Sequence, residues 1–177
     1  MDRRGNLFLV GMMGAGKTTL GRLLARRLKL RFIDCDLELE RRCGVKVPTI
    51  FDIEGEAGFR SRETQTLAEL TALEGIVLAT GGGAVLAEEN RRCLAARGTV
   101  IYLSARPEDL FERVRQDRNR PLLATPDPLK RLRELHAVRD PLYRSIADLV
   151  FDSGRQSIQT LARSITEQLS ARWKRSA

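Results

Sequence analysis

The chain has 177 residues, of which 42% are hydrophobic and 31% are charged, values typical of one globular domain rather than a disordered or repeat protein. Its longest apolar runs, such as 7–10 and 100–103, are only a few residues long, whereas a membrane-spanning helix needs about 20. The net charge of +8 comes from Lys and Arg spread through nearly every segment, without the interleaved aromatic residues that stack on bases, and this favours small anionic ligands over nucleic acid.

The cysteines, the histidine and the N-terminus exclude further classes of protein. Cys35, Cys43 and Cys93 are odd in number, lie far apart and contain no C-x-x-C pair, so neither a disulfide framework nor a zinc site is predicted. The single histidine, His136, is interpreted as an ordinary helix residue. Residues 1–6 lead into the first apolar run without the apolar region of a signal peptide, so a cytoplasmic location is expected.

Five short apolar or β-branched runs alternate with helical patterns along the chain. The runs are apolar on both alternations, as in parallel strands that helices cover on both faces. Leucines at 20, 23, 24 and 28 form one helical stripe, and apolar residues between 158 and 169 form another,. The alternating order predicts an α/β fold with a parallel sheet, in a single domain that spans residues 1–177. The predicted strands are 7–10, 31–34, 76–80, 100–103 and 148–151.

Two segments do not fit the simple alternation. Residues 36–75 are long enough for several helices; Pro48 suits a helix first turn, while Gly55 and Gly58 are expected to break the helical pattern,. Residues 117–128 are charged, contain three prolines and have no periodicity. This second segment is interpreted as a mobile flap.

A phosphate-binding loop follows the first predicted strand. The segment GMMGAGKT at 11–18 lies between that strand and the first helical stripe, which is the context that a P-loop requires. Its glycines let backbone N–H groups surround phosphates at a helix N-terminus, Lys17 reaches the β- and γ-phosphates, and the Thr18 hydroxyl is a ligand for Mg²⁺. The chain has no Asn-Lys-x-Asp run, which a GTPase would use to read the base, so the predicted donor is ATP.

Polar residues and glycines follow the second and third predicted strands. Asp34 and Asp36 end the second strand, and residues 81–83, all glycine, follow the third. Ligands gather at the carboxyl ends of parallel strands, so these residues are expected to meet the P-loop in one crevice. On an extended chain the two acids would point the same way, one near the metal and one near the acceptor. A helix N-cap for Asp36 and a tight turn for the glycines remain the structural alternatives.

Arg60 and Glu63 stand three residues apart at the head of a helical segment, so they share a face and can form an ion pair. An arginine held in this way can present its planar guanidinium to a carboxylate by two-point contact, which lysine supplies poorly. A solvated surface ion pair is the alternative interpretation.

Taken together, these residues resemble the shikimate kinase family over nearly the whole chain. That family transfers the γ-phosphoryl group of ATP to the 3-hydroxyl of shikimate in aromatic amino-acid biosynthesis. The resemblance implies a nucleoside-monophosphate-kinase-like P-loop fold with strand order 2-3-1-4-5, shikimate as the partner, ATP and Mg²⁺ as cofactors, and a monomer. It rests on the P-loop, the acids at 34 and 36, FRSRE at 59–63, the glycines at 81–83, RNRPLL at 118–123, and Arg139 with Tyr143.

The resemblance also implies roles for individual residues. It assigns region 35–64 to shikimate binding and 116–128 to a mobile lid, with Asp36, Lys17 and Arg120 as catalytic residues and Thr18 and Asp34 at the metal. Shikimate would contact Asp36, Arg60, Glu63, Gly82, Gly83 and Arg139. ATP would contact Gly14, Ala15, Gly16, Lys17, Thr18, Thr19, Arg113, Arg120 and the 154–156 turn with Gln156.

Two alternatives and one departure accompany this interpretation. Another small-molecule kinase of the same fold, such as a gluconate or nucleoside-monophosphate kinase, would share the P-loop and flap and differ in the acceptor pocket. A nucleic-acid-binding or protein-binding module that uses ATP as a switch is the alternative from a different class. The segment GVKVPTI at 44–50 departs from many family members, which have a small polar residue after the glycine, and this affects only the wall of the acceptor pocket.

Overall fold

The computed structural model describes residues 5–117, 120–154 and 156–175. Arg118, Asn119 and Arg155, which belong to the predicted flap and adenine turn, lie outside the described residues. The strands are β1 (Leu7–Val10), β2 (Arg31–Asp34), β3 (Ile76–Ala79), β4 (Thr99–Ser104) and β5 (Leu149–Asp152). The helices are α1 (Lys17–Leu28), α2 (Cys35–Cys43), α3 (Val47–Leu70), α4 (Glu88–Arg97), α5 (Pro107–Val114), α6 (Pro128–Ile146) and α7 (Ile158–Arg175), with 3-10 turns η2 (Ala84–Leu86) and η3 (Pro121–Leu123).

The five strands form one parallel sheet in the order β2-β3-β1-β4-β5. This confirms the predicted fold class and strand order, with strand ends that differ from the prediction by at most one residue. β1 lies in the centre, where Leu9 pairs with Ala79 of β3 on one side and with Ile101 of β4 on the other. All the strands therefore end at the same edge of the sheet.

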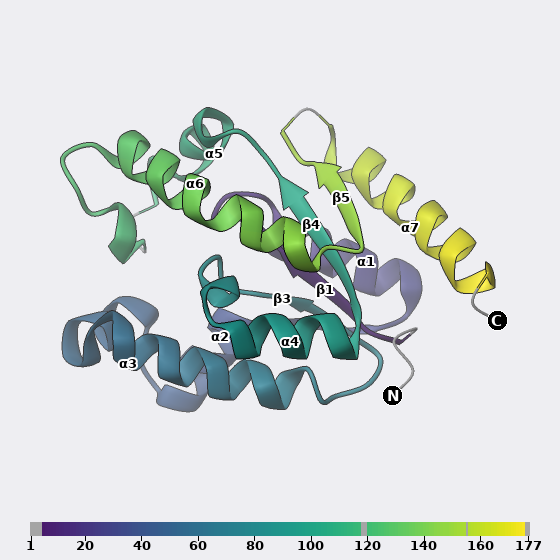
Figure 1. Cartoon of the computed structure of the whole chain (residues 1–177), viewed down its shortest axis with the longest axis horizontal. Coiled ribbons are helices and arrows are strands. Elements are labelled where there is room, and N and C mark those ends of the chain that lie inside the picture. The colour runs from purple at the N-terminus through teal and green to yellow at the C-terminus, as the bar shows by residue number, and fades with distance from the viewer. Residues whose placement is uncertain (1–4, 118–119, 155, 176–177) are drawn as a thin grey trace.

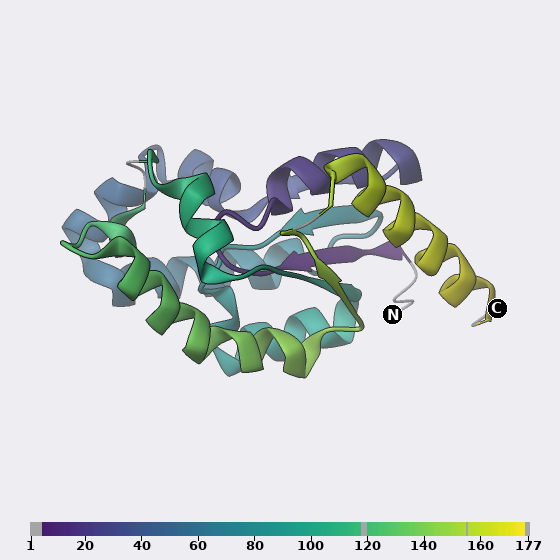
Figure 2. The ribbon, with the colours of Figure 1, turned by 90° about the horizontal axis from the view of Figure 1, so that it is seen from above.

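Helices cover both faces of the sheet (Figure 1). Seen from above, α1 and α7 lie on one face, while α4 and α6 lie on the other (Figure 2). The central strands β1, β3 and β4 are almost entirely buried, and their apolar side chains form the core with the inner faces of these helices. Among the described residues, no helix has the length and apolar character needed to cross a membrane.

The two edge strands differ from the prediction of full burial. In β2 only Ile33 is buried, and in β5 only Phe151 is buried. An edge strand has a neighbour on one side only. Its other side is open to solvent, and the helices that cover the sheet do not extend far enough to bury its side chains. The expectation of burial on both faces therefore holds for the central strands and is wrong for β2 and β5.

The segment between β2 and β3 folds as two helical elements, as its length predicts. Pro48 lies in the first turn of α3, and Gly55 breaks that helix with a positive φ of 70°. The prediction for Gly58 is wrong, because this residue continues the helix. A Cβ at Gly58 would lie 2.5 Å from the Cβ of Glu54, so close packing across the kink explains the glycine there.

Candidate active site

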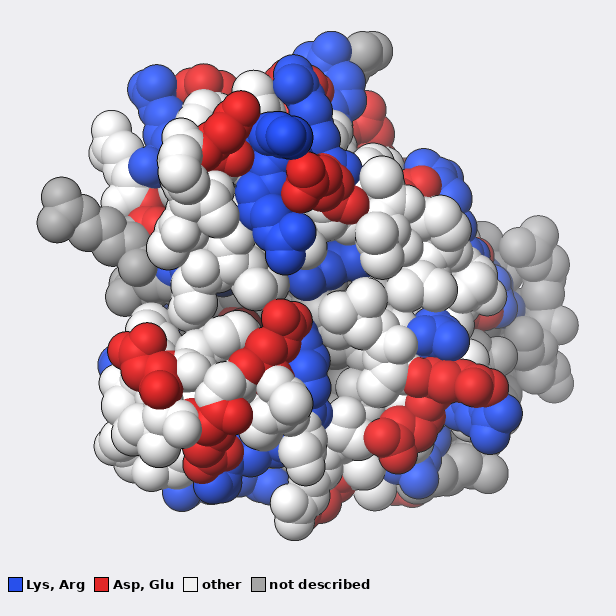
Figure 3. Space-filling model, turned by 60° about the vertical axis from the view of Figure 1, so that its left-hand side comes forward, with Lys and Arg blue, Asp and Glu red and all other residues white. Residues whose placement is uncertain are grey.

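A cavity of about 840 Å³ opens at the carboxyl ends of the strands. It is lined by the P-loop, the first turn of α2, α3, the glycine turn after β3, the segment before α6 and the start of α7. Figure 3 shows this side of the molecule hollowed between an upper and a lower part, with Lys and Arg side chains along the hollow. The predicted site residues, which lie far apart in the sequence, are thus brought to one cavity.

The P-loop joins β1 to α1 and contributes the floor of the cavity. Gly14 and Gly16 have positive φ values of 79° and 93°, a conformation that glycine adopts readily. The Lys17 ammonium is buried and donates hydrogen bonds to the carbonyls of Gly11 (2.7 Å) and Met12 (2.8 Å). Burial lowers the pKa of Lys17 to about 8, although the nearby Asp36 opposes this shift. Backbone N–H groups and one ammonium at a helix N-terminus form a cradle suited to phosphate.

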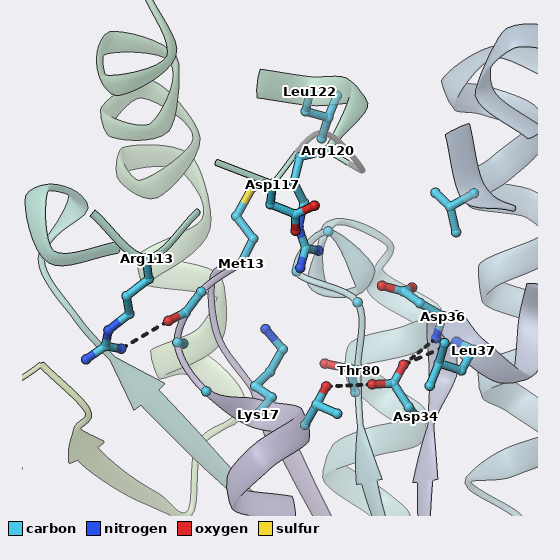
Figure 4. Close-up of a pocket in the computed structure, with 18 of the residues that line it drawn as sticks. Met13, Lys17, Asp34, Asp36, Leu37, Thr80, Arg113, Asp117, Arg120 and Leu122 are labelled. Atoms are coloured by element: carbon cyan, nitrogen blue, oxygen red, sulfur yellow. Dashed lines mark hydrogen bonds and ion pairs between the residues drawn. The ribbon is translucent and has the colours of Figure 1, made fainter. Parts of the chain in front are cut away.

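Thr18 and Asp34 form an oxygen-rich corner beside the P-loop (Figure 4). The Thr18 hydroxyl donates a hydrogen bond to Asp34 Oδ2 at 2.6 Å, so its lone pairs remain available on the other side. Asp34 Oδ1 accepts the backbone N–H groups of Asp36 (3.1 Å) and Leu37 (3.2 Å) and caps α2. A hydroxyl and a carboxylate oxygen beside a phosphate cradle are the hard ligands that Mg²⁺ takes, with water and phosphate completing the set. These residues fit the metal.

Asp36 lies in the first turn of α2 and not on extended chain as predicted. The helix begins at Cys35, directly after β2. Its N-cap residue is Asp34, and not Asp36 as the alternative interpretation had it. The Oδ1 atom of Asp36 is buried and has no hydrogen-bond partner among the described residues. Burial, with Asp34 nearby, raises the pKa of Asp36, while Lys17, Arg120 and Arg60 act in the opposite direction. A half-buried carboxyl with one buried, unpartnered oxygen in the cavity is suited to receive a hydroxyl group,.

Arg60 and Glu63 form the predicted ion pair on α3, with Arg60 Nη1 2.7 Å from Glu63 Oε2. The Glu63 side chain is 1% exposed, so the solvated surface pair is the wrong alternative. Arg60 also contacts Glu56 at 3.3 Å, which continues its support along the helix. The pair fixes the guanidinium at the cavity wall.

The glycine turn after β3 packs directly against the charged side chains of the cavity. A Cβ at Gly81 would lie 2.4 Å from Glu63 Oε1 and 3.0 Å from Asp36 Oδ1. A Cβ at Gly83 would lie 2.2 Å from Arg60 Nη2. A larger residue at either position would displace these functional side chains, so the glycines serve the site and not only a tight turn.

Arg139 of α6 also lines the cavity, beside the same glycine turn as Arg60. Its side chain is buried, and its Nη1 atom lies 3.6 Å from the position of a Cβ at Gly82. Tyr143, one turn further along α6, hydrogen-bonds the Arg139 guanidinium and donates its hydroxyl to the Gly82 carbonyl. No separate role was predicted for Tyr143, because an aromatic residue in a helical stripe is typical of the core.

The segment before α6 and the start of α7 cover the P-loop side of the cavity. Arg120 donates a hydrogen bond to Asp117 at 2.9 Å, and its side chain lies above Lys17 in the view of Figure 4. The contact with Asp117 was not predicted from the sequence. Arg113 donates to the carbonyls of Gly14 (3.0 Å) and Ser153 (2.6 Å), which connects the P-loop to the β5–α7 turn. Gln156 and Thr19 also line the cavity there.

The unusual segment at 44–50 forms the outer wall, as predicted. Lys46, Val47 and Pro48 line the cavity. Lys46 is ion-paired with Glu40 at 2.8 Å, and Glu40 also accepts the Val47 N–H at 3.0 Å. The wall is therefore held through Glu40 of α2.

The comparisons with known proteins agree with this geometry. The shikimate kinase family model matches residues 13–170. The shikimate kinase of Ralstonia nicotianae is 60% identical over 164 residues, which cover 93% of this chain and 86% of that protein. The chain belongs to the shikimate kinase family. Another family member, from Thiobacillus denitrificans, is 60% identical over 163 residues, with coverage of 92% and 89%.

Solved structures include members of the same family and also other kinases that share the fold. A shikimate kinase from Acinetobacter baumannii in complex with shikimate is 46% identical, with a TM-score of 0.93 and coverage of 95% of this chain and 94% of that one. A gluconokinase from Sinorhizobium meliloti has a TM-score of 0.62 at 16% identity, with coverage of 97% and 94%. The second likeness shows that the shikimate kinase family shares its fold with other small-molecule kinases.

Proposed function

We propose that this protein transfers the γ-phosphoryl group of ATP to the 3-hydroxyl of shikimate, which gives shikimate 3-phosphate. The observation that carries the proposal is the convergence of a P-loop, a half-buried aspartate and two arginines on one cavity. Family membership over residues 13–170 supports the same acceptor, and the relative from Acinetobacter baumannii is described in complex with shikimate.

ATP would bind along the P-loop, from Gly14 to Thr19, with its phosphates in the cradle around Lys17. Arg113 and Gln156 lie where the base and sugar would extend past the start of α7. Thr18 would hold Mg²⁺ directly, and Asp34 would do so through water. When bound, the metal would supply positive charge that offsets the negative charge of the phosphates.

Shikimate carries one carboxylate and several hydroxyls, and the other half of the cavity offers matching groups. Arg60 and Arg139 would bind the carboxylate, because a guanidinium gives planar two-point contact. Glu63 holds Arg60 in place. Asp36 and the backbone of Gly82 and Gly83 would then face the ring hydroxyls. Regions 35–64 and 116–128 would act as the acceptor-binding part and the lid of a single domain.

The transfer itself depends on positioning and charge. Placing two substrates side by side can contribute ~7–11 kcal/mol to lowering the barrier. Asp36 would accept the proton of the attacking hydroxyl, an effect typically worth about 10²–10⁴-fold. Lys17 and Arg120 would stabilise the charge that spreads over the transferred group. The raised pKa of Asp36 makes it a better proton acceptor than an exposed aspartate,.

The competing interpretations fit the cavity less well. A nucleoside-monophosphate site would need amide groups to read a base. Phe51 and Phe59 do line the cavity, but the described polar side chains around them are arginines and carboxylates, and the one amide side chain in the lining, Gln156, lies near the start of α7. A gluconate kinase shares the fold, yet the likeness to the gluconokinase stands at 16% identity. Dispersed charge argues against a nucleic-acid partner.

The test is ADP release from ATP and Mg²⁺ with shikimate, gluconate, a panel of nucleoside monophosphates or no acceptor. We expect strong stimulation by shikimate alone. Arg60→Lys should raise the KM for shikimate far more than the KM for ATP, because lysine loses the two-point contact. Activity with another acceptor and none with shikimate would refute the proposed substrate and retain the P-loop.

A further inference from the structure

The Tyr143 hydroxyl lies where three parts of the active site meet. It donates a hydrogen bond to the Gly82 carbonyl, hydrogen-bonds the Arg139 guanidinium, and lies 3.6 Å from the Met12 sulfur in the P-loop. The residue is 0% exposed, and the residues lining the cavity include Gly82 and Arg139 but not Tyr143. Tyr143 therefore stands behind the cavity wall and contacts two proposed shikimate-binding groups at once.

The contact with Gly82 fixes the direction of a backbone N–H. In a trans peptide the carbonyl and the following N–H point in opposite directions. The Gly82 carbonyl accepts from the buried Tyr143, so the N–H of Gly83, a residue that lines the cavity, points away from Tyr143,. The carbonyls on either side have backbone partners: Gly81 accepts from Ala84 at 3.1 Å, and Gly83 accepts from Leu86 at 3.0 Å. Glycine backbone rotates freely without such contacts, and the Gly82–Gly83 peptide relies on Tyr143.

The contact with Arg139 differs from the way Arg60 is held. Arg60 is paired with the carboxylate of Glu63, which balances its charge. Tyr143 is a neutral partner, and burial raises its pKa well above the usual value, so it keeps its proton. A neutral acceptor orients Arg139 and leaves the positive charge of the guanidinium for an incoming carboxylate.

The Tyr143 ring is held by a second tyrosine. The rings of Tyr102 and Tyr143 stack with centroids 4.9 Å apart and an interplanar angle of 29°. The Tyr102 hydroxyl donates to Asp140 Oδ1 at 2.6 Å, and Asp140 is also paired with Arg144 at 2.8 Å. Stacking against the Tyr102 ring supports the Tyr143 ring, whereas the Tyr102 hydroxyl contacts Asp140 on α6 rather than Gly82.

We propose that Tyr143 is a positioning residue for the acceptor, whose hydroxyl aligns the Gly82–Gly83 peptide and the Arg139 guanidinium with each other. The inference rests on the proposed function. It requires that loss of the hydroxyl affects shikimate and leaves ATP unaffected, because the P-loop takes its shape from its own glycines and from Lys17.

The test compares Tyr143→Phe with Tyr102→Phe in steady-state kinetics with both substrates. Each variant loses one buried hydroxyl from the same stacked pair. For Tyr143→Phe we expect the KM for shikimate to rise about tenfold, the effect of one hydrogen bond to a charged group, with the KM for ATP unchanged. Tyr102→Phe should leave both KM values near the wild type, although its melting temperature can fall.

Two results would overturn the proposal: an unchanged KM for shikimate in Tyr143→Phe, or an equal rise for ATP. A wild-type enzyme that does not phosphorylate shikimate would instead refute the proposed function.

The chain has two tyrosines, so 3-fluorotyrosine in the Tyr102→Phe background labels Tyr143 alone and needs no change at position 143. Its ¹⁹F resonance should shift on saturation with shikimate, and a resonance that does not move would count against the proposal even where Tyr143→Phe fails to fold.

Discussion

Substitution of Gly83 by alanine should give a folded protein that binds shikimate poorly. A Cβ at this position would lie 2.2 Å from Arg60 Nη2 and 2.3 Å from Arg60 Cζ, where real Cβ atoms essentially never come within 3.0 Å. The guanidinium would have to retreat by at least 0.8 Å, the difference between 3.0 and 2.2 Å. Its ion pair with Glu63 opposes that movement. A displacement of about 1 Å in a substrate-positioning group can reduce the rate ~10²-fold.

The backbone itself accepts the change. Gly83 has φ −92° and ψ −1°, the conformation of the third residue of a type I turn, which is compatible with most residues, and replacing glycine where the backbone permits it stabilises a protein by ~0.4–1 kcal/mol. We therefore expect a melting temperature at or slightly above the wild type, a fall of about 10²-fold in kcat/KM for shikimate, and an unchanged KM for ATP. Coupled ADP-release kinetics and thermal unfolding measure these values.

Gly82→Ala is the matched comparison, because a Cβ there would meet Met13 N at 3.4 Å and Arg139 Nη1 at 3.6 Å, which are ordinary contacts. Its loss of activity should be smaller than that of Gly83→Ala. In an Arg60→Ala background, Gly83→Ala should have little further effect, since no guanidinium remains to be displaced. A wild-type KM for shikimate in Gly83→Ala, or equal losses for both substrates, would refute this reasoning.

Three further predictions concern other parts of the molecule. Asp36→Asn should lower kcat by about 10²–10⁴-fold while ATP still binds in a nucleotide titration; near-normal turnover would exclude its role as base. Arg113→Ala removes the contacts with the Gly14 and Ser153 carbonyls and should raise the KM for ATP but not for shikimate. Gly21→Ala would place a Cβ 2.5 Å from the Phe32 ring, so urea unfolding should show a loss of ~1–3 kcal/mol with both KM values unchanged.

The sequence predicted those features that depend on local pattern. The P-loop was identified because its glycines, Lys17 and Thr18 stand between an apolar run and an amphipathic helix, and the structure has that arrangement. The Arg60–Glu63 pair followed from helical spacing alone. The strand order was implied by the resemblance to a family, since hydropathy alone does not decide which strands are neighbours.

Features that depend on the exact start of a helix or on packing were not predictable in this way. Asp36 was expected on extended chain, but Asp34 caps α2 and starts the helix at Cys35. Gly58 was expected to break a helix and continues it, because the constraint there is the Cβ of Glu54 across the kink. Tyr143 received no role, since its contact with the Gly82 carbonyl joins elements that are 61 residues apart.

Most of the net positive charge of the protein lies outside the cavity. Among the described residues, six Lys or Arg and five Asp or Glu line the cavity, so the site contributes a difference of one to a net charge of +8. An anionic donor and an anionic acceptor therefore do not enter a strongly positive cavity. They meet cations whose positions are fixed, by a carboxylate for Arg60, by Asp117 for Arg120 and by Tyr143 for Arg139. Because field strength falls with distance, affinity should follow the placement of these groups, and neutralising surface lysines outside the cavity should have little effect on either KM.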